Sequence, residues 1–487
     1  MEKPITFSGG QYQPLEQKEI QRLHDSALSV LYNTGVRVDS EEAMAVFEKG
    51  GAIVDRNSNR VRFRPITIEN ALRNVPQGVT LFSRDGLHDL RLEKTNVYLG
   101  TGGAAPDVDD LDTEEERPAT LKDVADFARL VDALENLHFY VRPCTASSEV
   151  PREYLGMNEF YAAISNTSKH VMGAACTVQD ARNIIRLAEI IAGDSDALRK
   201  RPFISFITGL IISPLRFDPE PIAVLTEIVR SGIPVALSSA PMAGLTSPIT
   251  LAGTLVQLHA EELSCITLAQ MLAPGTPILY GGVPSMTDMH ELDYVGGGVE
   301  FGLMNAAISQ LSQHIDVPCF NSAGVTEAKI PDMQAVYEKT FAICQCVLSG
   351  SNCIHHVAGM LESLMKVNYA QMLIDNEIAG MAIRALRGIE LDEDRLATDT
   401  IDAVGPGGSF IASKHTVKYM RTEFYEPFLA DRHDYETWRH LRIKDIRKRA
   451  AREAKKILKQ HRPMGIPPEI DRQIRSELKI YSRGSSQ

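Results

Sequence analysis

The feature that most constrains the fold of this chain is an eightfold alternation of short apolar runs with helical patterns between residues 97 and 388. The helical segments carry apolar residues three and four positions apart, as from Leu121 to Leu134, where Thr120 and Asp123 form a capping pair. Short strands that alternate with helices predict a parallel sheet. Eight such units predict a (β/α)8 TIM barrel, whereas the alternative, a doubly wound sheet, usually stops near six strands. The runs are Val97–Leu99, Leu137–Val141, His170–Met172, Phe203–Ile207, Pro234–Leu237, Pro277–Tyr280, Pro318–Phe320 and Asn352–His356.

The segments on either side of this pattern predict two further regions. Residues 1–95 read as an N-terminal α+β appendage, with a helix from Leu15 to Tyr32 and a hairpin around the polar turn 55–59. Residues 96–388 form the predicted barrel, and residues 389–487 a C-terminal helical extension that packs on it. The stretch 439–459 is strongly basic. A solvated amphipathic helix is the favoured interpretation, and docking of an acidic partner protein is the alternative.

Composition and charge exclude several classes of protein. The net charge of −12 at pH 7 argues against nucleic-acid binding, which needs basic residues to neutralise phosphates. The first ten residues have no apolar signal segment, and the most apolar run, 203–215, is too short to span a bilayer. Seven cysteines scattered through apolar segments fit reduced, buried thiols. We therefore expect a cytoplasmic protein without membrane contact, and a homo-oligomer stays open.

Candidate site residues follow from the rule that TIM-barrel enzymes react at the carboxyl ends of their strands. Gly102 follows the first predicted strand, Asn321 and Glu327 follow the seventh, and His355 and His356 end the eighth. Adjacent residues of a strand point to opposite faces, so one histidine should face the barrel axis and the other the helices. The alternatives are a hydrogen-bonded core histidine and an exposed loop carboxylate.

Motifs of other enzyme classes are missing from the sequence. Asp288, His290, Glu291 and Asp293 lie close together, and a zinc or hard-metal site is conceivable there. No CxxC or HExxH spacing supports such a site, so a polar loop is favoured and no bound metal is expected. The chain also has no phosphate-binding P-loop, no dinucleotide fingerprint at its first strand and no GxSxG nucleophile elbow.

Four stretches carry a family resemblance that covers nearly the whole chain. They are "RPATLKDVADFARLVDAL", "YGGVPSMTDM", "NSAGVTEAKIPDMQAVYEKT" and "GPGGSFIASKHTVKYMRTEFYEPFLADR". The chain resembles the trimethylamine methyltransferase family, including its non-pyrrolysine members that act on quaternary amines. The resemblance implies a barrel that transfers a methyl group to Co(I) of a cognate corrinoid protein, so that the cobalamin is carried by the partner.

One departure from the namesake enzymes bears on the substrate. Those enzymes hold a pyrrolysine near the end of strand seven, whereas residues 322–329 here are all standard. A quaternary ammonium needs no general acid, because it leaves as a neutral tertiary amine. The resemblance therefore implies a small quaternary amine as substrate. Glycine betaine is favoured, followed by proline betaine, carnitine and γ-butyrobetaine.

Positioning and charge complementarity are then the main tasks of the site. We assign catalytic roles to His355, His356 and Glu327. Aromatic faces can hold the cation, and hydrogen-bond donors such as His355, His356, Asn321 or a glycine-loop N–H can hold a betaine carboxylate. Trp438, the one tryptophan, lies outside the predicted barrel. The predicted substrate-binding residues are Tyr98, Tyr140, Tyr280, Phe320, Asn321 and Gly102.

Three other functions stay open at this point. The first is a zinc-dependent corrinoid methyltransferase that acts on a thiol or an alcohol. The second is a non-catalytic betaine-binding barrel. The third is a barrel lyase with Glu327 as base, for which the sequence offers no partner acid or metal.

Overall fold

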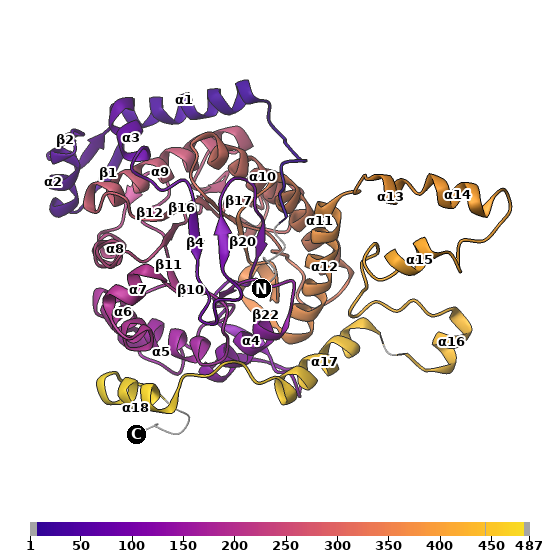
Figure 1. Ribbon diagram of the computed structural model, residues 1–487. Helices are drawn as coiled ribbons and strands as arrows, with labels where there is room; N and C mark the ends of the chain where they lie inside the picture. Colours follow the sequence, from indigo (N-terminus) through magenta and orange to yellow (C-terminus); the bar gives the residue numbers. More distant parts are fainter. Residues whose placement is uncertain (1–6, 444, 482–487) are drawn as a thin grey trace.

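The computed structural model describes residues 7–443 and 445–481. Its centre is a parallel sheet enclosed by helices (Figure 1). The sheet has eight strands in the order β6-β20-β19-β16-β14-β11-β10-β9. Strand β6 pairs with β20 through Tyr98 and Cys353, and a parallel bridge from Gly100 to Phe139 joins it to the segment of β9. The sheet therefore closes, which confirms the predicted barrel and excludes the doubly wound alternative. The strands are β6 (Tyr98–Leu99), β9 (Tyr140–Val141), β10 (Val171–Gly173), β11 (Ile204–Thr208), β14 (Val235–Leu237), β16 (Ile278–Gly282), β19 (Cys319–Ser322) and β20 (Cys353–His355).

A helix follows each barrel strand and covers its outer face. The first of them begins at the predicted capping box, in which the Thr120 and Asp123 side chains each bond the other residue's backbone. A short helix, α7 (Ser195–Lys200), adds to the third unit. The eight covering helices are α4 (Leu121–Ala133), α5 (Arg152–Ile164), α6 (Val178–Ala192), α8 (Pro219–Ser231), α9 (Leu251–Leu272), α10 (Val299–His314), α11 (Met333–Ser349) and α12 (Tyr369–Arg387).

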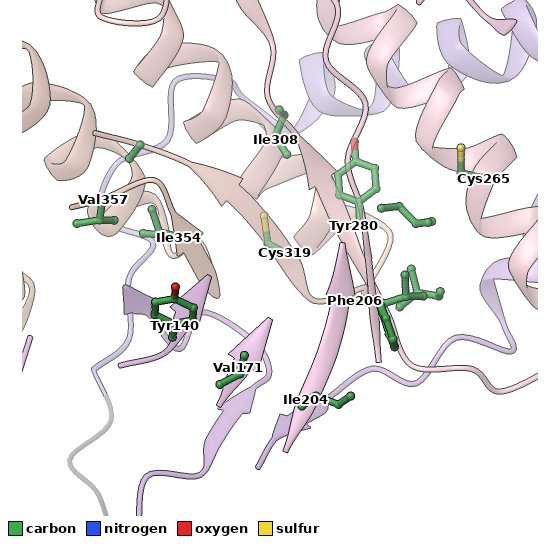
Figure 2. Packing of buried hydrophobic residues seen from close by; sticks show 14 of the residues in the cluster. Tyr140, Val171, Ile204, Phe206, Cys265, Tyr280, Ile308, Cys319, Ile354 and Val357 are labelled. Atoms are coloured by element: carbon green, nitrogen blue, oxygen red, sulfur yellow. The ribbon is translucent and has the colours of Figure 1, made fainter. Parts of the chain in front are cut away.

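The barrel strands separate two apolar layers. The outer layer lies between strands and helices and includes Tyr140, Phe206 and Tyr280 (Figure 2). The inner layer fills the barrel and includes Phe139, Phe320 and the hairpin β4 (Val79–Leu81) and β5 (Leu90–Leu92). This hairpin precedes β6 and plugs the amino-terminal end of the barrel. The carboxyl ends of the strands are left as the accessible end.

The N-terminal region is joined to the barrel by a shared sheet. Its strand β1 pairs with β3 and also with β13, which belongs to an excursion that follows β11. Helix α1 packs on α9, where Nδ1 of His24 lies 2.9 Å from Nε2 of His259. The predicted helix and hairpin of this region are both present. The elements are α1 (Gln17–Asn33), β1 (Val36–Val38), α2 (Glu41–Lys49), β2 (Ile53–Asp55), β3 (Arg60–Arg62), α3 (Pro65–Leu72), β12 (Ile211–Ile212) and β13 (Arg216–Phe217).

Loops at the carboxyl ends of the strands form two small sheets of their own. One joins the excursions after β6 and β20, and the other joins those after β14 and β16. They give the accessible end of the barrel a structured rim. Their elements are β7 (Asp107–Asp109), β8 (Glu116–Pro118), β15 (Met242–Ala243), β17 (Ser285–Thr287), β18 (Tyr294–Val295), β21 (Met360–Leu361), η1 (Glu362–Leu364) and β22 (Lys366–Asn368).

The C-terminal residues form an excursion and then return to the barrel. Helices α13 (Glu393–Leu396), α14 (Thr398–Val404), α15 (Lys414–Tyr419) and α16 (Tyr435–His440) project from one side (Figure 1). The basic helix α17 (Ile446–Gln460) packs on α12 and α4 through Ala450 and Ala454, and α18 (Pro468–Glu477) packs on α6. In the part of the chain that the structure describes, no helix is both long and apolar enough to cross a membrane.

The plug generates a stability prediction. Leu81 is fully buried in the hairpin, so Leu81→Ala should lower the free energy of unfolding by about 2–5 kcal/mol. The matched control is Leu87→Ala, since Leu87 lies in the same hairpin and is 62% exposed. Denaturant and thermal unfolding midpoints measure both. Equal midpoints for the two variants would show that the hairpin does not plug the barrel.

Candidate functional site

Small residues surround the accessible end of the barrel, which we call the mouth. They follow or end several strands, and many are partly exposed although the strands below them are buried. At the partly exposed positions among them, a ligand can therefore approach the backbone closely. The residues are Gly102 and Gly103 after β6, Ala174 and Ala175 after β10, Gly209 after β11, residues 238–240 after β14, Gly281 and Gly282 in β16, and residues 322–324 at the end of β19.

The two histidines that end the eighth strand lie side by side in the mouth. Strand β20 stops at His355, and His356 adopts a left-handed conformation with φ of 62°. Their ring centroids are 3.8 Å apart. The prediction that they point to opposite faces is therefore wrong, because it assumed an extended backbone through both residues. Both side chains are almost completely buried.

The protonation of His355 follows from its hydrogen bond. Its Nδ1 lies 2.6 Å from the backbone oxygen of Asn321, and its ring stacks on Phe320 with centroids 4.1 Å apart. A carbonyl oxygen only accepts, so Nδ1 carries the proton. Burial lowers the pKa of His355 to about 4, so the ring is neutral at pH 7 and Nε2 keeps a free lone pair. His355 is thus an acceptor toward a ligand, and not the donor expected for a carboxylate.

His356 completes a cluster built from three neighbouring strands. Its Nδ1 lies 2.7 Å from the hydroxyl of Ser322, and burial lowers its pKa well below the ordinary value. A Cβ atom at Gly102, which has a φ of 156°, would lie only 2.7 Å from the His356 ring. Glycine is therefore needed where the first strand's loop passes the histidines. We call Gly102, Phe320, Ser322, His355 and His356 the histidine cluster.

Four of the predicted substrate-binding residues lie away from this cluster. The Tyr140 hydroxyl donates to the backbone of Val124 in α4, and the Tyr280 hydroxyl lies 2.7 Å from His259 in α9. The amide of Asn321 donates to the backbone of Asn305 in α10. All three side chains thus point into the outer layer. Tyr98 points inward, but its hydroxyl accepts from the N–H of Arg91 in the plug.

Glu327 lies in the loop after β19 and holds the loop after β18. Its carboxylate accepts hydrogen bonds from the N–H groups of Gly296 at 2.8 Å and Gly297 at 3.0 Å. A Cβ atom at Gly297 would lie 2.5 Å from a Glu327 oxygen and 2.4 Å from a Glu338 oxygen. Two carboxylates therefore converge at the rim. Within the described residues, the hydrogen bonds of Glu327 do not reach the histidine cluster.

A buried ion pair stands behind the cluster. Nζ of Lys339 in α11 lies 2.8 Å from Asp375 in α12, and both side chains are fully buried. Asp375 also accepts the N–H of Gly359, in the turn that follows the histidines. The positive charge of Lys339 further lowers the pKa of His356. This pair was not predicted from the sequence, although Lys339 shares a helix face with Ala335 and Ile343, a signal that the lysine is buried.

The polar loop considered for a metal caps its own turn. Asp288 accepts the N–H groups of His290 at 2.7 Å and Glu291 at 3.0 Å. Across residues 7–443 and 445–481, no three histidine, cysteine, aspartate or glutamate side chains are grouped to hold a metal ion.

Comparisons with known proteins agree in one family. A family model described as trimethylamine methyltransferase (MTTB) matches residues 2–484. Trimethylamine methyltransferase MttB of Desulfitobacterium hafniense (strain DSM 10664 / DCB-2) is 35% identical over 459 residues, which cover 94% of this chain and 92% of the relative. Glycine betaine methyltransferase of Desulfitobacterium hafniense (strain Y51) is 32% identical over 466 residues, which cover 96% of each chain.

The solved structures show a similar fold at lower identity. The monomethylamine methyltransferase MtmB of Methanosarcina barkeri superposes with a TM-score of 0.51 and 14% identity, and the match covers 92% of this chain and 93% of that one. The family model spans nearly all of the chain, and two relatives are more than 30% identical over more than nine tenths of it. This chain is a methyltransferase that belongs to the trimethylamine methyltransferase family.

Proposed function

We propose that this protein transfers a methyl group from a small quaternary amine, with glycine betaine favoured, to Co(I) of a corrinoid carried by a partner protein. Relatives named for trimethylamine and for glycine betaine are 35% and 32% identical, so identity does not choose between the substrates. The observation that carries the proposal is the end of β19. There, Ser322, Ala323 and Gly324 stand at the barrel mouth, and no side chain of residues 322–329 is an electrophile that could capture an amine.

Methyl transfer from a quaternary amine can proceed without such an activating side chain. The methyl carbon forms its new bond with the electron pair of the corrinoid Co(I). The electron pair of the broken C–N bond stays on nitrogen, so that a neutral tertiary amine leaves. No proton moves, and no general acid is needed. The protein must then bind the cation, orient one methyl group toward the mouth and exclude water.

The histidine cluster can perform these tasks. The Phe320 ring and the neutral His355 ring with its free Nε2 lone pair present electron-rich surfaces to a trimethylammonium group. Near-complete burial of both histidines keeps water from the reacting carbon. The lysine–aspartate pair positions His356, because Asp375 holds the turn at Gly359. The small residues of the mouth leave room for a corrinoid face to approach.

Trimethylamine is the second candidate substrate, because the site contains hydrogen-bond acceptors. His355 offers an acceptor, and Glu327 and Glu338 place two carboxylates at the rim. Either acceptor could hold the N–H of a protonated tertiary amine, which would then leave as neutral dimethylamine because the proton stays on nitrogen during the transfer. The two candidates differ in whether transfer requires that N–H.

The substrate prediction compares three amines directly. Glycine betaine, dimethylglycine and trimethylamine are supplied separately at equal concentration with Co(I) cobalamin, and the Co(I) absorbance is followed. We expect the Co(I) absorbance to fall with glycine betaine only, because the site offers no group that activates a tertiary amine. Turnover of trimethylamine at or above the rate of every quaternary amine tried would contradict the proposal. A barrel that binds without catalysis would leave the absorbance unchanged throughout.

The histidine cluster is tested by single substitutions. His355→Ala and His356→Ala should each lower kcat/KM for methyl transfer at least tenfold, equivalent to about 1.4 kcal/mol of transition-state stabilisation. His290→Ala is the control, since His290 is exposed on the polar loop. Steady-state kinetics with Co(I) cobalamin measure all three variants. Rates like that of the parent protein in both cluster variants would remove the histidines from the mechanism.

Salt tests how the partner reaches the mouth. Arg447 and Lys448 in the first turn of α17 line a groove together with Ile330 and Pro331, which follow β19. This basic turn lies near the mouth and can steer an acidic corrinoid protein. Transfer to the partner should therefore slow as ionic strength rises, whereas transfer to free cobalamin stays constant. Partner rates that stay flat up to physiological salt would leave α17 as a solvated surface.

A further inference from the structure

One segment of the chain lacks a core of its own. We call residues 389–443 the arm; of these residues, all described, Leu429 alone is buried. Its helices α13 to α16 are four to seven residues long. Helices of this length are not stable in water without packing partners. The arm therefore needs a second molecule to pack against it.

The exposed side chains of the arm are apolar to an unusual degree. Six large apolar residues are each at least 65% exposed: Ile389, Leu391, Ile411, Val417, Phe424 and Tyr435. Single exposed apolar residues are ordinary on protein surfaces. A concentration of them on one projecting segment marks an interaction surface.

A second apolar surface lies on helix α11. Met333, Tyr337 and Phe341 stand four residues apart on one face and are between 52% and 87% exposed. The charged residues of this helix do not interrupt that face. Glu338 is half-buried and bonded to Thr326, and Lys339 is fully buried in its ion pair. The outer face of α11 is thus uncharged over more than two turns.

Both surfaces lie on the same side of the barrel. The arm leaves from the end of α12, which packs against α11, and then returns onto α12 (Figure 1). There, Arg384 donates to the backbone of Glu423, and Glu377 accepts from the backbone N–H of Phe428. One partner can therefore cover the arm and the α11 face together.

We propose that this side of the molecule is the interface between two copies of this chain, in which each copy covers the arm and the α11 face of the other. The corrinoid protein has to leave after each methyl transfer and would expose the arm again, whereas a second copy stays. A contact about a twofold axis buries the same patch on both partners.

The charge of the arm is also self-complementary. Residues 390–402 hold six acidic side chains and one basic one, and residues 414–421 hold Lys414, Lys418 and Arg421 without an acid. The two blocks already meet within one arm, where Lys418 pairs with Asp394. Two arms related by a twofold axis can repeat this pairing between copies, which favours a second copy over a partner of a single charge.

The mass of the purified full-length protein in solution tests the proposal. Analytical ultracentrifugation and mass photometry should find a dimer without substrate or cobalamin. Phe424→Asp in the arm and Tyr337→Asp on α11 should each raise the dimer dissociation constant at least about thirtyfold, the factor of an interface hot spot. Leu87→Asp is the control, since Leu87 lies on the plug hairpin and is as exposed as Tyr337, at 62%, so that this variant should leave the dimer intact.

The outcomes separate this proposal from the proposed function. A monomeric parent protein overturns it, and so does an oligomer that neither variant dissociates. A monomer in which Phe424→Asp slows transfer to the corrinoid protein, but not to free cobalamin, would assign the arm to that partner instead. The substituted residues are exposed, so circular dichroism should show folded variants. Methyl transfer from glycine betaine is measured in a separate assay, and its outcome does not depend on the oligomeric state.

Discussion

Pairing between the first and the last barrel strand is the constraint on which the other placements depend. Once β6 pairs with β20, every strand has one face toward the axis and one toward the helices. Phe320 then points inward and Asn321 outward, although they are neighbours in the chain. Closure also brings the ends of the first, seventh and eighth strands together. The histidine cluster is assembled from these three strands, so it exists only in the closed barrel.

The sequence predicted the barrel well because its signal is local and repeated eight times. Each predicted run overlaps a barrel strand, and the capping pair at Thr120 marks the start of α4. The site was less predictable because strands buried on both faces show no alternation that reveals which side chains point inward. Tyr140 and Tyr280 were expected to face a ligand for that reason, but they contact helices. The left-handed turn at His356 has no signal in the residues themselves.

The surroundings of the histidine cluster share one electrostatic character. Burial keeps both rings neutral, and the charges of Lys339 and Asp375 neutralise each other within the core. A buried ion pair rarely adds stability over a hydrophobic pair of similar size, so its worth here lies in holding the turn after β20. The site thus combines a framework held by the Lys339–Asp375 pair with histidines that stay neutral at pH 7. Such a framework fits the proposed methyl transfer from a quaternary amine, which needs no acid.

The glycines of the barrel bear on how enzymes with this architecture can diverge. A Cβ atom at Gly281 would lie 1.6 Å from the backbone oxygen of Phe320, and one at Gly324 would lie 2.7 Å from that of His356. Backbone packing forbids any side chain at these positions, whatever the ligand. Evolution, or a designed library, must therefore reshape the mouth elsewhere. Partly exposed positions at the mouth, such as Ala174, Ala175 and Ser238, are where substitutions can change its shape.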